Sequence, residues 1–218
     1  MKARFSFKVL VLVLITPLLI FPQVPVEAMS GETIPSFFDF VATVSDGQSG
    51  VVTGVYVTGM IANKVVQQFD NVPGYVSAIE GVVTQFRMSI PYGVIGLLAH
   101  NNLAGKNFAN LQQGQEVRII YGDGSVSSYI IKDIKRYKAN DPQSSVSNFT
   151  DLNTGMVYTS AQIFSIYYQS GSQVTFQTCI QQDGDLSWGR LFITAIPGVP
   201  VLAPLAFTIT PQTQFNYK

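Results

Sequence analysis

Short runs of alternating hydrophobic and polar residues, rich in valine, isoleucine and threonine, dominate the chain. The first two runs cover residues 51–58 and 60–69, and the turn residues 71–74 follow them. Runs of this length and composition predict β-strands. The apolar positions of residues 82–90 fit a short helix about as well as a strand, so both interpretations of this segment remain open.

The same pattern returns at intervals along the rest of the chain. Further strands are predicted at residues 94–100, 116–121, 126–137, 173–179 and 190–196. The turn residues Gly122, Asp123 and Gly124 separate the second and third of these strands, and an Asp-Gly pair between two β-rich runs predicts a hairpin. The last two strands are separated by residues whose composition predicts a polar loop.

Helices are expected only as short connections between strands. Residues 107–111 predict a helical turn. Residues 159–167 predict a helix, because a hydroxyl residue precedes the first alanine and the apolar residues make one side. Residues 140–155 form a polar loop in this interpretation. The fold class that follows is mostly β, with a closed or nearly closed β-barrel and short connecting helices.

The first residues of the chain have the composition of an export signal. Basic residues precede the apolar run 9–21, and Val26 and Ala28 place small residues at the two positions that set signal cleavage. These features predict a signal peptide over residues 1–28. The apolar run is shorter than the roughly 20 residues of a membrane span. An uncleaved N-terminal anchor with the same outside topology remains the alternative, and it would be the protein's only contact with the membrane.

Four parts of the chain are expected. The signal peptide or anchor occupies residues 1–28, a lead-in segment residues 29–49, a catalytic domain residues 50–197, and a C-terminal tail or edge strand residues 198–218. An exported chain of this kind works outside the cytoplasm, in the extracellular space or at the cell envelope.

Charge and composition exclude several classes of function. Thirteen basic and thirteen acidic residues balance to a net charge of zero, so no electrostatic attraction to nucleic acid is predicted. No glycine-rich phosphate loop or metal-spaced Cys/His cluster is present, and no cofactor is predicted. Asp183 and Asp185 offer two carboxylates, whereas calcium is usually bound by six or more oxygens. No metal site is therefore predicted, and calcium dependence remains open.

The chain contains one cysteine and one histidine, and both fall at the ends of predicted strands. An exported protein with one cysteine has no internal disulfide. Cys179 is therefore an apolar filler, an intermolecular link or a reactive thiol. A thiol becomes a strong nucleophile beside a base or a cation. If the chemistry uses cysteine and histidine, Cys179 and His100 are the only possible pair.

Three segments, two of which contain Cys179 and His100, carry further motifs. Residues 174–179 read Val-Thr-Phe-Gln-Thr-Cys and are similar to the signature Thr-Leu-x-Thr-Cys of the sortases, a family of cysteine transpeptidases, with Phe176 in place of leucine. Residues 188–193 resemble the strand that carries the sortase arginine. Residues 96–101, followed by 105–108 and 111–114, resemble the histidine segment and the turn and strand after it. The order His, Cys, Arg is also that of the family, and the resemblance covers roughly residues 51–197.

The resemblance to sortases implies a fold and a set of roles. It implies a closed eight-stranded barrel with Cys179 as nucleophile, His100 as acid/base partner and Arg190 as oxyanion stabiliser. Substrate binding is expected of Thr178, Asn101 and Trp188. For Trp188, a place in the core or at the barrel rim is the alternative. Because Phe176 replaces leucine, a differently filled core layer is expected.

The resemblance also implies a substrate and a reaction. Sortases recognise a short sorting signal on another exported protein, form a thioester, and pass the acyl group to an amine on the cell envelope or on another protein, or to water. Two alternatives remain: a sortase-fold thiol endopeptidase, and a catalytically silent β-barrel that only binds. The complete Cys/His/Arg set favours the enzyme, because a scaffold has no physical need for it.

Overall fold

The computed structural model describes residues 34–144 and 146–198. The predicted signal peptide, the first residues of the lead-in segment and nearly all of the C-terminal tail lie outside these described residues. Within the described residues, no helix is long and apolar enough to cross a membrane.

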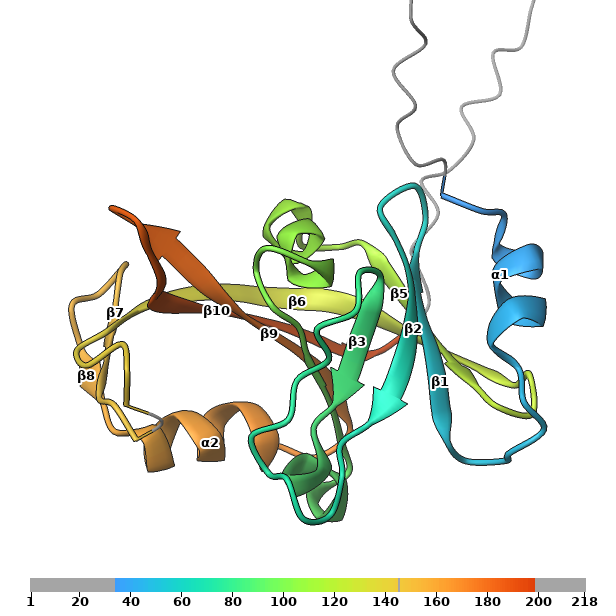
Figure 1. Ribbon diagram of the computed structural model, residues 1–218, viewed down its shortest axis with the longest axis horizontal. Helices are drawn as coiled ribbons and strands as arrows, with labels where there is room; N and C mark the ends of the chain where they lie inside the picture. Colours follow the sequence, from blue (N-terminus) through green and yellow to red (C-terminus); the bar gives the residue numbers. More distant parts are fainter. Residues whose placement is uncertain (1–33, 145, 199–218) are drawn as a thin grey trace, which may run out of the picture. The chain divides into compact units, whose positions relative to one another are not determined.

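Eight strands form a closed ring in which each strand is hydrogen-bonded to two neighbours (Figure 1). Their order around the ring is β10-β9-β4-β3-β2-β1-β5-β6, and pairing between β6 and β10 closes it. The ring strands are β1 (Val52–Val57), β2 (Ile61–Gln67), β3 (Val82–Gln85), β4 (Val94–Leu98), β5 (Glu116–Tyr121), β6 (Val126–Ala139), β9 (Gln173–Gln182) and β10 (Asp185–Pro197). This closed eight-stranded barrel confirms the predicted fold class.

Two further strands extend the sheet from β6. They are β7 (Phe149–Asp151) and β8 (Val157–Tyr158), which pair with each other, and β7 pairs with the C-terminal half of β6. Strand β7 lies within residues 140–155, which were predicted to form a polar loop. Its short length explains the difference, because three residues carry no readable alternation.

Residues 82–90, which fitted a helix or a strand, contain both. The strand β3 ends at Gln85, and a 3-10 helix, η1 (Arg87–Tyr92), follows and ends at Gly93. Gly93 has a φ of 73°, a left-handed conformation that glycine adopts without steric cost. The predicted helical turn at residues 107–111 is confirmed as η2 (Ala104–Asn110).

The prediction of a polar loop between the last two strands is wrong. Strand β9 continues to Gln182 and β10 begins at Asp185, so only Asp183 and Gly184 connect them. Both residues have positive φ, 51° and 84°, as in the tight turns that join twisted antiparallel strands. Polar residues continue the ladder here because their side chains remain exposed to solvent.

The interior of the barrel is filled by one apolar cluster. Val55, Leu97, Ile119 and Ile193 are fully buried in it. Phe176 is also fully buried and meets the edge of the Phe108 ring, with ring centroids 5.0 Å apart. The core layer expected to differ because of Phe176 is therefore filled by an aromatic pair.

Among the described residues, two α-helices lie on the outside of the barrel. The predicted helix is confirmed as α2 (Ser160–Tyr168), and its N-cap Thr159 forms a capping box with Gln162. Tyr167 of α2 stacks on Phe192 of β10 with ring centroids 4.1 Å apart. The other helix, α1 (Phe37–Val44), packs on β1 and β5 and was not predicted.

Candidate active site

Strand β9 has two distinct faces, and Cys179 lies on the outer one. Val174 and Phe176 point into the barrel interior. Because side chains alternate along a strand, Thr175, Gln177 and Cys179 point outward. The contacts agree, since the Thr175 hydroxyl donates a hydrogen bond to the Tyr167 carbonyl of the covering helix α2. Cys179 is a free, half-buried thiol.

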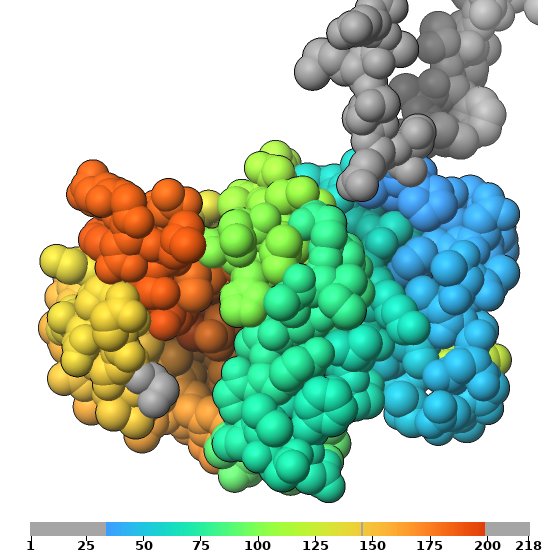
Figure 2. All heavy atoms as spheres, in the orientation of Figure 1, coloured from blue at the N-terminus to red at the C-terminus, as the bar shows by residue number. Residues whose placement is uncertain are grey.

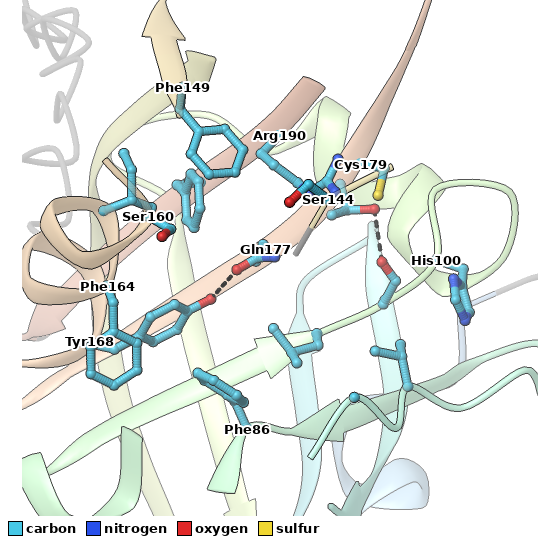
Figure 3. Close-up of a pocket in the computed structure, with 17 residues that line it drawn as sticks. Phe86, His100, Ser144, Phe149, Ser160, Phe164, Tyr168, Gln177, Cys179 and Arg190 are labelled. Atoms are coloured by element: carbon cyan, nitrogen blue, oxygen red, sulfur yellow. Dashed lines mark hydrogen bonds between the residues drawn. The ribbon is translucent and has the colours of Figure 1, made fainter. Parts of the chain in front are cut away.

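Arg190 lies directly opposite Cys179 in the antiparallel pair formed by β9 and β10. Directly opposite residues of an antiparallel pair share a face, with Cβ atoms about 4.5–5.5 Å apart. The next outward pair in the ladder is Phe192 with Gln177. The thiol and the guanidinium are therefore neighbours on the outside of the barrel, as Figure 3 shows.

His100 reaches the same level from the other side of β9. Strand β4 runs parallel to β9, with Leu98 paired to Gln177. The pairing continues one residue further, because the Ala99 amide donates to the Gln177 carbonyl at 3.2 Å. The Thr178 hydroxyl donates to the Ala99 carbonyl at 2.9 Å. His100 follows Leu98 by two residues, and Cys179 follows Gln177 by two residues. Continued for two residues, the register therefore places His100 beside Cys179.

The backbone around His100 is held by a close turn. The His100 carbonyl accepts hydrogen bonds from the amides of Leu103 and Gly105, both at 3.0 Å. A Cβ at position 105 would lie 2.7 Å from that carbonyl oxygen and would also collide with the Thr178 hydroxyl. Only glycine fits here, and the close approach sets where β4 delivers the histidine.

The guanidinium of Arg190 is anchored by two backbone carbonyls. One of its nitrogens, Nη1, donates to the carbonyls of Ser187 and Gly189, each at 2.9 Å. Ser187 is itself fixed, because its amide donates to the Asp185 carboxylate at 2.8 Å. No other hydrogen bond from this guanidinium to the described residues is formed, so its remaining N–H groups are available to a ligand.

These three residues lie at a pocket of about 400 Å³ on the outer face of the barrel. Figure 3 shows His100, Cys179 and Arg190 toward one end of it and aromatic side chains toward the other. In Figure 2 the surface is hollowed where orange residues lie deep between yellow and green segments. The lining residues are Gly74, Val76, Phe86, Leu98, Ala99, His100, Ser144, Phe149, Ser160, Ile163, Phe164, Tyr168, Gln177, Thr178, Cys179, Arg190 and Phe192.

The structure brings together four of the six predicted site residues at this pocket. They are Cys179, His100, Arg190 and Thr178. Thr178 is 4% exposed, and its hydroxyl donates a hydrogen bond to the Ala99 carbonyl. Thr178 therefore presents little of its hydroxyl to the pocket.

Asn101 and Trp188 do not line the pocket. The Asn101 side-chain amide donates to the Leu186 carbonyl at 3.0 Å and so ties the segment after His100 to the start of β10. Trp188 is partly buried in an irregular stretch of β10, where the register shifts between Asp185 and Gly189. Their roles in substrate binding remain predictions.

Sequence reasoning missed the residues that shape the rest of the pocket. Gln177 shares the outward face with Cys179, and the Tyr168 hydroxyl donates a hydrogen bond to its side-chain oxygen. Burial raises the pKa of Tyr168 above its usual value. The sequence could have indicated Gln177, because residues two apart on a strand lie on the same face and Gln177 precedes Cys179 by two residues. The contribution of α2 was not, because it depends on where the helix packs.

Within the described residues, no group of three or more His, Cys, Asp or Glu side chains is placed to hold a metal ion. Asp185 accepts a hydrogen bond from the Ser187 amide, and Asp183 occupies the exposed turn between β9 and β10.

Comparisons with known proteins find similarity in solved structures alone. Neither a protein-family model nor a curated protein sequence matches the chain. The chain is similar to a lid mutant of sortase A from Corynebacterium diphtheriae, at 15% identity and a TM-score of 0.43, covering 71% of this chain and 72% of that one. It is similar to sortase C-1 from Actinomyces oris, at 15% identity and a TM-score of 0.42, covering 77% and 83%.

A third similar structure is sortase E1 from Streptomyces coelicolor with a tripeptide in its active site, at 15% identity and a TM-score of 0.43, covering 71% of this chain and 91% of that one. At this level of identity the likeness concerns the fold alone. In fold, the chain is similar to sortases of several classes.

Proposed function

We propose that this protein is a cysteine transpeptidase of the sortase kind that acts on exported proteins outside the cytoplasm. One observation carries the proposal. Arg190 of β10 lies directly opposite Cys179 of β9, and His100, just after the end of β4, lies beside Cys179 in the register of the other neighbouring strand. Three adjacent strands thereby present a nucleophile, an acid/base group and a fixed cation to one pocket. This is the set that thiol-based acyl transfer requires.

In the first half of the reaction, the Cys179 thiolate attacks the carbonyl carbon of a substrate peptide bond and forms a C–S bond. The carbonyl oxygen becomes an oxyanion, to which the free N–H groups of Arg190 donate hydrogen bonds. As the C–N bond breaks, His100 gives its proton to the departing amine. The products are a thioester on Cys179 and a free amine.

In the second half, an incoming amine attacks the thioester carbon, and His100 removes a proton from the attacking nitrogen. Collapse of the tetrahedral intermediate breaks the C–S bond, forms a new amide bond and restores the Cys179 thiolate. With water as the nucleophile, the product is a carboxylic acid and the reaction is proteolysis. Transfer to an amine on the cell envelope or on another exported protein is the reaction proposed here.

The first experiment measures the rate at which iodoacetamide alkylates Cys179 in the folded protein. Cations beside a thiol favour the reactive thiolate, so Arg190→Ala and His100→Ala should each slow alkylation at neutral pH. Arg136→Ala is the matched control, because Arg136 lies exposed on β6. A thiol that does not react, or that responds equally to all three substitutions, contradicts the enzyme and favours a silent binding module.

The second experiment traps the thioester. The protein is incubated with a library of extended peptides, and the intact mass is measured before and after treatment with hydroxylamine, which cleaves thioesters. We expect an acyl adduct that hydroxylamine removes and that Cys179→Ala lacks. Adding a primary amine should then convert the adduct to an amide product. An adduct that releases only acid identifies an endopeptidase.

A further inference from the structure

Gln177 is a polar side chain set into an otherwise largely apolar stretch of the pocket. It lies on the outward face of β9, two residues before Cys179, and lines the same pocket. The surrounding wall is formed by Phe86, Leu98, Phe164 and Phe192. A glutamine at this place is not required by the barrel, whose interior lies on the opposite face of β9.

The orientation of the Gln177 amide is determined by Tyr168. The Tyr168 hydroxyl donates a hydrogen bond to the Gln177 side-chain oxygen, and Tyr168 itself is 3% exposed. Burial raises the pKa of this phenol, which keeps it protonated and able to donate. The amide nitrogen of Gln177 therefore points away from Tyr168, as Figure 3 shows.

The Gln177 amide nitrogen has no hydrogen-bond partner among the described residues. The open pocket leaves this donor accessible to solvent, which can accept its hydrogen bond. A peptide that fills the pocket removes this water, and an unpaired buried donor then costs binding free energy. A ligand that supplies an oxygen acceptor avoids this penalty, and one that supplies only a hydrocarbon does not. Pockets with such polar groups discriminate strongly against ligands that leave them unpaired.

The spacing along β9 places this acceptor on the ligand. Residues two apart on a strand are about 6.7 Å apart, and an extended peptide lying along the strand has the same rise per residue. A group that meets Gln177 is then two residues from the carbonyl that Cys179 attacks. The acyl half of the substrate stays bound from the first attack by Cys179 until the thioester is resolved, whereas the amine half leaves after the first step. A contact with the acyl half can therefore select the substrate in both steps.

We propose that Gln177, held by Tyr168, determines which residue the substrate peptide carries two positions before the attacked carbonyl. The selected residue has a side chain with an oxygen acceptor, such as the amide of asparagine. This inference rests on the proposed transpeptidase function. It assigns Gln177 to substrate selection and Tyr168 to the positioning of the Gln177 amide.

The test uses two peptide pools that share apolar residues and differ only in having asparagine or leucine, which are close in shape, at one position. The rate of Cys179 acylation is measured by mass spectrometry. Wild type should prefer the asparagine pool by about ten-fold. Gln177→Leu should lose or reverse this preference, and Tyr168→Phe should reduce it. Gln181→Leu, the same substitution at an exposed position of β9 that does not line the pocket, should keep it.

A second readout separates this inference from the proposed reaction. In Cys179→Ala protein, which cannot be acylated, the side-chain amide signal of Gln177 is followed by nitrogen-15 NMR during titration with each pool. A shift with asparagine peptides alone supports the inference even if wild type is never acylated, in which case only the proposed function fails. Acylation or binding that ignores Gln177→Leu overturns the inference and leaves the function intact. Absence of both acylation and binding overturns both.

Discussion

Arg190 and Cys179 are directly opposite residues of the β9–β10 ladder, because the chain between them reverses direction through a two-residue turn. The guanidinium is held on its own strand by the carbonyls of Ser187 and Gly189, so it reaches the thiol's surroundings in one orientation. A cation fixed in this way needs little reorganisation when negative charge develops on a substrate, which is the physical basis of oxyanion stabilisation.

Replacement of Arg190 by lysine tests whether geometry matters in addition to charge. Arg190→Lys keeps the positive charge but loses the planar fork that binds two carbonyls and a substrate oxygen together. We expect iodoacetamide alkylation of Cys179 to stay near the wild-type rate and kcat/KM for peptide acylation to fall about 100-fold. Peptide acylation at the wild-type rate would show that charge alone is sufficient.

Asn101 connects the histidine segment to the arginine strand through its hydrogen bond to the Leu186 carbonyl. Asn101→Ala should therefore loosen the relative placement of His100 and Arg190 and slow alkylation of Cys179 several-fold in the absence of peptide, since one hydrogen bond contributes about 1 kcal/mol. The matched control is Asn102→Ala, at the exposed neighbouring residue. If Asn101→Ala changes only KM for peptides, Asn101 binds substrate and does not position the site.

Gly105 tests the close turn behind His100. Gly105→Ala would force a Cβ against the His100 carbonyl and the Thr178 hydroxyl, which lie where the segments after β4 and at the end of β9 meet. We expect a loss of about 1–3 kcal/mol in the free energy of unfolding, measured in urea, together with slower alkylation of Cys179. Gly74→Ala is the control, because a Cβ there meets no atom within 4 Å. Equal stability of the two variants would contradict the tight fit.

Two buried tyrosines at the contact of α2 with the barrel, Tyr167 of α2 and Tyr137 of β6, predict alkaline destabilisation. Burial raises the pKa of Tyr167 above its usual value near 10, and its hydrogen bond with Tyr137 acts in the same direction. A group whose pKa is raised by folding binds its proton more tightly in the folded state. Its contribution to stability is therefore complete below pH 10 and is lost as pH rises above that value.

Urea unfolding measured between about pH 9 and 11 should show this loss, and Tyr167→Phe should have a shallower pH slope. The exposed Tyr92→Phe serves as the control, with the wild-type slope expected. A Tyr167→Phe slope identical to wild type would mean that folding does not perturb this phenol.

Local patterns in the sequence predicted a large part of the fold. Period-two alternation located every ring strand except β3, whose segment fitted a helix equally well, the Asp123-Gly124 pair located a hairpin, and the hydroxyl before Ala161 located the helix that Thr159 caps. These features depend on residues close together in the chain, so they can be read without knowing the partners. The short strand β7 and helix α1 were missed, because β7 is too short for a pattern and α1 is stabilised by packing on β1 and β5.

The sequence by itself determined which groups were available: one thiol, one imidazole and an arginine in a segment of sortase-like pattern. Only the tertiary structure decided where they meet. The parallel pairing of β4 with β9 joins residues 79 positions apart, and the antiparallel pairing of β9 with β10 sets Arg190 opposite Cys179. Register of this kind follows from closure of the whole barrel and from burial of one face of each strand. For the same reason the orientation of Gln177 by Tyr168 became visible only once α2 lay on the sheet.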